Sequence, residues 1–122
     1  MLDMAVKEKM EYFREVMEVL HQYEIMPTRS PVLVFTEANK ESDRVHLLAL
    51  REICKMCLEM VERHFKNLKS AEVSTQIKEV NKSAREDAFE AYLLSANWTE
   101  LGVLEGRLLG CVARLNQLII HS

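Results

Sequence analysis

WTELGVLEGRLLGCVARLNQLIIHS, residues 98–122, is the stretch that decides the predicted fold. Its apolar side chains recur at alternating steps of three and four residues, as they do on the buried side of a helix. These side chains are Leu101, Leu104, Leu108, Cys111, Leu115 and Leu118. Thr99 is the expected N-cap, with the Glu100 carboxylate at the positive end of the helix. The pattern predicts a helix over about 99–119, around which the other helices pack.

All three glycines of the chain lie in this stretch, at Gly102, Gly106 and Gly110. Residues four apart form a ridge on a helix, and a ridge without side chains allows close approach of another backbone. Three interior glycines cost about 3 kcal/mol relative to alanine in an exposed helix, so we expect close packing to offset that cost. A line of small residues upstream is the expected partner within the chain: Ala84, Ala88 and Ala91. The alternative is a glycine contact between two copies in a homodimer.

Composition indicates an all-α protein with one domain, residues 1–122. Hydrophobic residues make up 48% of the chain, and three glycines with two prolines are too few for a turn-rich β fold. Apolar periodicity predicts three further helices, at about 2–24, 43–69 and 71–95. Pro27 ends the first of them, and Ser42 or Asp43 caps the second, although Thr36 is an earlier possible start. The expected fold is a compact four-helix bundle-like domain, mostly antiparallel.

The boundary between the second and third helices is the least defined, because no glycine or proline separates them. Ser70 favours a turn, since serine is a poor residue inside a helix and a good cap. One continuous helix of about 50 residues is the alternative, and it would favour a coiled-coil hairpin or dimer.

An irregular strap is predicted over 27–42, between the first two helices. Its centre has four consecutive apolar residues of high β propensity, Val32, Leu33, Val34 and Phe35. One interpretation is an extended segment that buries these side chains across the bundle. The other is a docking segment that pairs with a partner protein or is exchanged between subunits. We therefore predict these four residues as partner-binding.

Two patterns have the spacing of metal ligands. Cys54 and Cys57 would share a helix face, and Cys111 with a histidine could complete a zinc site. Their apolar neighbours instead favour three buried thiols in a reducing compartment. Glu18-x-x-His21, with Asp43 and His46, resembles the spacing of di-iron bundles, but Glu18 lies away from the apolar side of its helix. We predict no metal, no cofactor and, without a nucleophile or phosphate-loop motif, no catalysis.

The charge pattern limits the classes of partner. Sixteen basic and nineteen acidic residues are interspersed and give a net charge of −3, so nucleic acid is not an expected partner. No uninterrupted apolar run is long enough to span a membrane, and we expect a cytoplasmic location. The predicted function is a non-catalytic protein–protein interaction module: an adaptor, a chaperone-like protein or a regulatory subunit, possible also as a homodimer. The alternatives are a small-molecule or lipid binder and a metal-binding bundle.

Overall fold

The computed structural model describes residues 4–26, 32–69 and 88–122. This part of the chain contains four α-helices and one short 3-10 helix, and it contains no strand. The elements are α1 (Val6–Gln22), η1 (Glu37–Asn39), α2 (Lys40–Lys69), α4 (Ala88–Ser95) and α5 (Trp98–Ile120). The predicted all-α, bundle-like fold is confirmed.

The apolar seam of α5 is the centre of the packing. All six of its predicted members are buried, and its five leucines are fully inaccessible to solvent. The C-terminal half of the seam packs with α1, α2 and the 32–36 segment. The N-terminal half packs with α4 and with the second half of α2. One helix therefore holds both hydrophobic clusters together.

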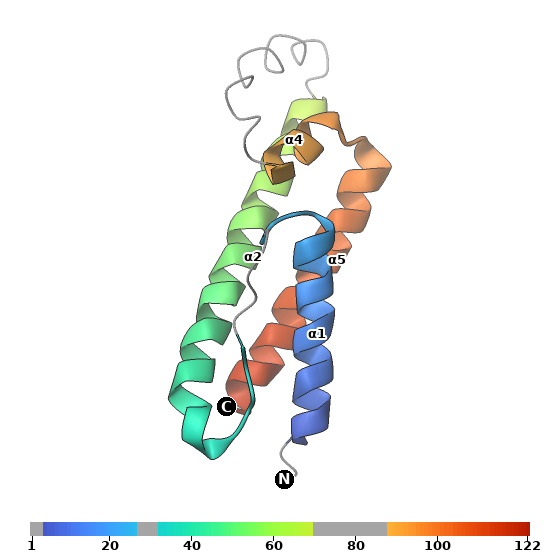
Figure 1. The fold of residues 1–122 in the computed structure, drawn as a ribbon. Coiled ribbons are helices and arrows are strands. Elements are labelled where there is room, and N and C mark those ends of the chain that lie inside the picture. The colour runs from blue at the N-terminus through green and yellow to red at the C-terminus, as the bar shows by residue number, and fades with distance from the viewer. Residues whose placement is uncertain (1–3, 27–31, 70–87) are drawn as a thin grey trace.

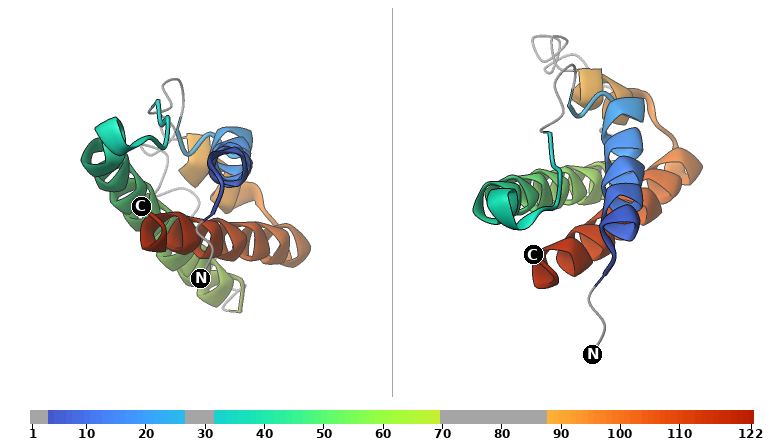
Figure 2. Two further views of the ribbon diagram at one scale, coloured as in Figure 1. Left: turned by 90° about the horizontal axis from the view of Figure 1, so that it is seen from below. Right: turned by 60° about the horizontal axis from the view of Figure 1, so that its bottom comes forward.

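The described elements α1, α4 and the 32–36 segment cover one side of the pair formed by α2 and α5. Figure 1 shows the three long helices, α1, α2 and α5, side by side, with α4 near the end of α2 and the beginning of α5. In the two views of Figure 2, α1 and the 32–36 segment lie on the same side of the α2–α5 pair. Within the described residues, the opposite side of α5 carries no packed element.

Helix α1 ends at Gln22, two residues before the predicted end at residue 24. The amide of Ile25 donates to the Leu20 carbonyl at 2.8 Å, and the amide of Glu24 donates to the His21 carbonyl at 3.1 Å. Glu24 has a positive φ of 55°. This pattern is a Schellman motif, in which a left-handed residue closes the helix. The helix therefore ends through its own backbone before Pro27 is reached.

Two helix starts differ from their predicted positions. Thr36 precedes the 3-10 turn η1, which leads directly into α2 at Lys40 instead of residue 43. The N-cap of α5 is Asn97 and not Thr99. Asn97 accepts from the Glu100 amide at 2.9 Å, and the Glu100 carboxylate accepts from the Asn97 amide. This reciprocal capping box satisfies two amides at once, which a cap at Thr99 would not do.

The predicted third helix is described only in its last part, α4 (Ala88–Ser95). Phe89 and Leu93 are its buried residues, and they pack on the N-terminal half of α5. The predicted start of the third helix at residue 71, the proposed turn at Ser70, and Ala84 lie outside the described residues.

Alternate side chains of the 32–36 segment enter the core. Leu33 and Phe35 are buried, whereas Val32 is 84% exposed and Val34 is 40% exposed. The Phe35 ring meets the Phe13 ring of α1 edge-on, with 6.3 Å between centroids. Residues 32–36 thus cross the bundle as the strap interpretation predicts, but only Leu33 and Phe35 of the four apolar residues are buried.

A buried carboxylate fixes the end of this strap. Asp43, in the first turn of α2, is 3% exposed and accepts a 2.8 Å hydrogen bond from the Phe35 amide. Phe35 itself has a positive φ of 54°, a conformation that disfavours bulky side chains. The Asp43 hydrogen bond and the burial of the Phe35 ring together offset that strain.

Leu33→Ala should lower the free energy of unfolding by about 2–5 kcal/mol, because it opens a cavity in the core. Val32→Ala should change it by less than about 0.5 kcal/mol, because that side chain is solvent-exposed. Urea denaturation of the two variants measures both effects. Equal, small effects would show that the strap is not packed as described.

Asp43→Ala should destabilise the protein by about 1–3 kcal/mol, because the buried Phe35 amide would lose its acceptor. Asp43→Asn retains a side-chain oxygen at the same place and should cost less than the alanine variant. Thermal or urea unfolding of both variants checks the order. If Asn and Ala were equally tolerated, the hydrogen bond would not fix the strap.

Candidate functional site

The glycine line of α5 faces solvent in the described structure. A Cβ added at Gly102 or Gly106 would meet nothing within 4 Å, and one at Gly110 would meet only the Arg114 side chain, at 3.0 Å. Ala88 and Ala91 are also exposed. The predicted packing of the glycines on the alanine line within the chain is therefore wrong for these residues. The physical reason is angular, because the glycine line lies on the side of α5 opposite the leucine seam.

The solvent-facing side of α5 forms a continuous surface without charges, which we call the outer face. It consists of Gly102, Val103, Gly106, Leu109, Gly110, Ala113, Gln117 and Ile120. Gly110 is half-buried and the other seven are exposed. Its large apolar members are well exposed: Val103 at 50%, Leu109 at 53% and Ile120 at 70%. Charged residues are usually abundant on the exposed side of a helix and are depleted in the centre of protein interfaces.

Polar contacts hold α5 on both borders of the outer face. On one border, Arg107 donates to Gln22 and Arg114 pairs with Glu15, both on α1. On the other border, Arg51 of α2 donates to the Asn116 oxygen at 2.9 Å. Arg107 and Arg114 are thus directed toward α1, and Arg51 reaches from α2 to α5. The outer face between them remains open.

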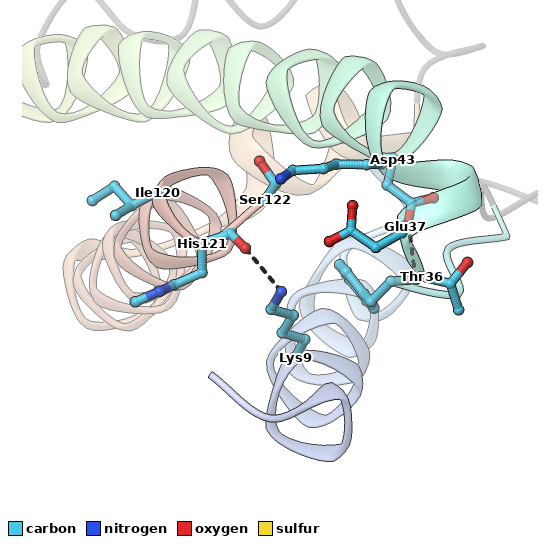
Figure 3. Close-up of a pocket in the computed structure, with 9 residues that line it drawn as sticks. Lys9, Thr36, Glu37, Asp43, Ile120, His121 and Ser122 are labelled. Atoms are coloured by element: carbon cyan, nitrogen blue, oxygen red, sulfur yellow. Dashed lines mark hydrogen bonds between the residues drawn. The ribbon is translucent and has the colours of Figure 1, made fainter. Parts of the chain in front are cut away.

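A polar cavity of about 220 Å³ lies where the C-terminal end of α5 meets α1 and the start of α2 (Figure 3). The Lys9 ammonium donates to the His121 carbonyl at 2.8 Å. Arg44 donates to the Ile119 carbonyl at 3.2 Å. Cations at a helix C-terminus satisfy its last carbonyls and the negative end of its dipole. Lys9 and Arg44 therefore cap the C-terminal end of α5 and link it to α1 and α2.

A second hollow, of about 440 Å³, lies on the surface of α1. Its lining mixes apolar and charged side chains: Lys7, Met10, Glu11, Phe13, Arg14 and Met17. A volume of this size is within the range of small-ligand sites. All of these residues come from one helix, so the hollow is a surface groove and not an enclosed cavity between elements.

The cysteines lie in the core, at the junction of α2 and α5. Cys54, Cys57 and Cys111 are buried and reduced. The hydrogen bond between the Cys54 and Cys111 thiols, together with burial, raises the pKa of Cys54 above its usual value. A protonated, buried thiol is a poor nucleophile and a poor metal ligand. This environment favours the interpretation of the cysteines as core residues.

The acid–histidine pairs are not brought together. Glu18, His21 and His46 are exposed, and the buried Asp43 carboxylate binds the Phe35 amide. Among residues 4–26, 32–69 and 88–122, no group of three or more histidine, cysteine or acidic side chains is arranged to hold a metal ion.

Sequence reasoning missed most of the outer face. The spacing of the glycines points to this side of α5, but the apolar periodicity does not distinguish Val103, Leu109, Ala113 and Ile120. The available signal was the absence of charged residues at these positions, although Glu105, Arg107 and Arg114 occur in the same helix. The predicted partner-binding group 32–35 is divided: Leu33 and Phe35 belong to the core, and only Val32 and Val34 present exposed side chains.

Gly106→Ala should raise the free energy of unfolding of the single chain by about 1 kcal/mol, because alanine favours the helix and its Cβ has open space. The measurement is chemical denaturation at low protein concentration. A loss of stability as large as that caused by overpacking a core would show that the added Cβ at Gly106 does not face solvent.

None of the described helices has the length and apolar character needed to cross a lipid bilayer. Neither a protein-family model nor a curated protein nor a solved structure matches this chain.

Proposed function

We propose that the protein is a non-catalytic protein-binding module whose contact surface is the outer face of α5. The observation that carries the proposal is a helix face without charged residues opposite the buried seam, with open space above Gly102 and Gly106. Contiguous exposed apolar surface on a folded protein marks interaction sites. An adaptor, a chaperone-like protein or a regulatory subunit would each use such a face.

The energetics of the face favour a partner that approaches closely. The three glycines cost α5 about 3 kcal/mol relative to alanine, and among the described residues only the Arg114 side chain, at Gly110, enters the space they leave. Burial of the exposed side chains of Val103, Leu109 and Ile120 would stabilise a complex by about 25 cal/mol for each Å² of apolar surface removed from water. A partner backbone close to the glycines would allow all three side chains to be buried together.

The exposed strap residues are a secondary part of this proposal. Val32 and Val34 present apolar side chains to solvent, so they are available for contact. Leu33 and Phe35 would have to leave the core to reach a partner. The main contact is therefore placed on α5 and not on the strap.

The candidate chemical groups support a binding role in preference to catalysis. The Cys54 thiol is buried with a raised pKa, and the Asp43 carboxylate is used to hold the strap. Three cysteines, an odd number and all buried among apolar side chains, fit a reducing compartment, which supports a cytoplasmic location.

The groove on α1 gives the small-molecule alternative a specific place. Met10 is 42% exposed there, and Met17 and Phe13 form an apolar base. An apolar ligand that raised the unfolding temperature, and whose effect was lost in Met10→Glu, would favour this second function.

A photo-activatable amino acid in place of Leu109 should form covalent adducts with the partner protein in cells. The same amino acid in place of Met56 is the matched control, because Met56 is 62% exposed but lies on α2 away from the outer face. Mass spectrometry of the adducts identifies the partner. Equal adduct yields at both positions, or none at Leu109, would contradict the proposed contact surface.

A further inference from the structure

We infer that Cys54 of α2 and Cys111 of α5 form a disulfide when the folded protein reacts with hydrogen peroxide. The pair is a redox modification site that joins two long helices covalently. This site lies at the buried junction of α2 and α5 and does not use the outer face. The inference therefore goes beyond the proposed function, and either one can fail without the other.

The first argument is the register of α2 and α5, which run antiparallel and side by side (Figure 1). In the first half of α2, Arg51 donates to the Asn116 oxygen at 2.9 Å. Near the end of α2, the Phe65 ring meets the Trp98 ring with 5.1 Å between centroids. In an antiparallel pair, each step forward along one helix corresponds to a step back along the other. These two contacts therefore fix which residues of the helices face each other between them.

This register places Cys54 opposite Cys111. Cys54 follows Arg51 by three residues, and Cys111 precedes Asn116 by five residues. The two cysteines belong to the same hydrophobic cluster and are 0% and 1% exposed. Cys57, one turn further along α2, belongs to the other cluster, which contains no second cysteine. Cys54 therefore faces a thiol across the helix pair, whereas Cys57 does not.

The second argument is the contact between the two thiols. The hydrogen bond that Cys54 donates lowers the pKa of Cys111 against the opposing effect of burial, and the charge of Arg114 adds to the lowering. Cys111 is therefore the thiol that reacts first, because the thiolate is the nucleophile. A disulfide joins sulfurs about 2.05 Å apart. Thiols already in hydrogen-bond contact reach that distance by side-chain rotation and a small approach of the helices.

The reaction is balanced with hydrogen peroxide as the oxidant. The Cys111 sulfur attacks one peroxide oxygen, the O–O bond breaks, and the released hydroxide takes the Cys111 proton to form water. The product is a sulfenic acid at Cys111. The Cys54 sulfur then attacks the Cys111 sulfur, the S–O bond breaks, and the leaving hydroxide takes the Cys54 proton as a second water. The thiol pair is oxidised to a disulfide, and the peroxide is reduced to water.

Burial determines which product forms. Hydrogen peroxide is small and uncharged, so brief local opening of the helix pair is enough to admit it. A bulky thiol from solution is kept out by the same burial. Within the chain, Cys54 is the thiol that faces the sulfenic acid at Cys111. The expected product is therefore the disulfide within the chain and not a mixed disulfide.

Peptide mapping of the full chain tests the pairing. The folded protein is treated with millimolar hydrogen peroxide, the remaining thiols are alkylated, and trypsin cleaves after Lys55, which separates Cys54 from Cys57. We expect residues 52–55 linked to residues 108–114, with Cys57 alkylated and with the link lost after reduction. A link between Cys57 and Cys111, three alkylated cysteines, or oxidation that stops at the sulfenic or sulfinic acid would each overturn the inference.

Cysteine variants and unfolding provide the controls. Cys57→Ala removes a buried thiol from the same helix and should form the Cys54–Cys111 link in the native yield. Cys54→Ala should lose the disulfide at Cys111. Urea should abolish the preference of Cys54 for Cys111 over Cys57, because the helix register is then lost. Retention of that preference in urea, or loss of the link in Cys57→Ala with unaltered circular dichroism, would show that the folded contact does not direct the pairing.

Discussion

The leucine seam of α5 is the interaction on which the rest of the structure depends. Five fully buried leucines on one helix contact α1, α2, α4 and the strap. Burying each leucine contributes about 1.5–3 kcal/mol, so the seam outweighs the roughly 3 kcal/mol that three glycines cost. The helix can therefore carry a bare outer face and still be stable. Its inner side determines the fold, and its outer side is available for function.

The uneven cover of α5 explains why the outer face is distinctive. The strap, α1 and α4 lie on one side of the α2–α5 pair, and the Asp43 hydrogen bond to the Phe35 amide keeps the strap there. Arg107 and Arg114 reach from α5 to α1, and Arg51 reaches from α2 to α5. Among the described residues, what remains between these contacts is a helix face without charged residues, which is covered only at Gly110, by the Arg114 side chain.

Much of this structure could be predicted from residue spacing, because spacing reports which side of an element is buried. All six seam residues follow from local periodicity, whereas the four consecutive apolar residues of the strap carry no alternation that would separate the buried Leu33 and Phe35 from the exposed Val32 and Val34. Helix ends were harder to predict from spacing. Asn97 caps α5 together with Glu100, and Glu24 ends α1 in a left-handed conformation. The cost of three glycines within a helix predicts a packed, interior position for them. Their angular position, opposite Leu104 and Leu108, already placed them outside. Contacts between distant residues, such as Arg51 with Asn116, have no local signal.

The central claim is that the bare side of α5 is a contact surface. Amide NMR spectra recorded with and without the protein captured in the Leu109 adducts test it directly, because the three glycines lie on this surface. The account predicts that the Gly102, Gly106 and Gly110 signals shift or broaden together, while the signal of Met56 stays constant. Glycine signals that remain unchanged while the Met56 signal moves would contradict it.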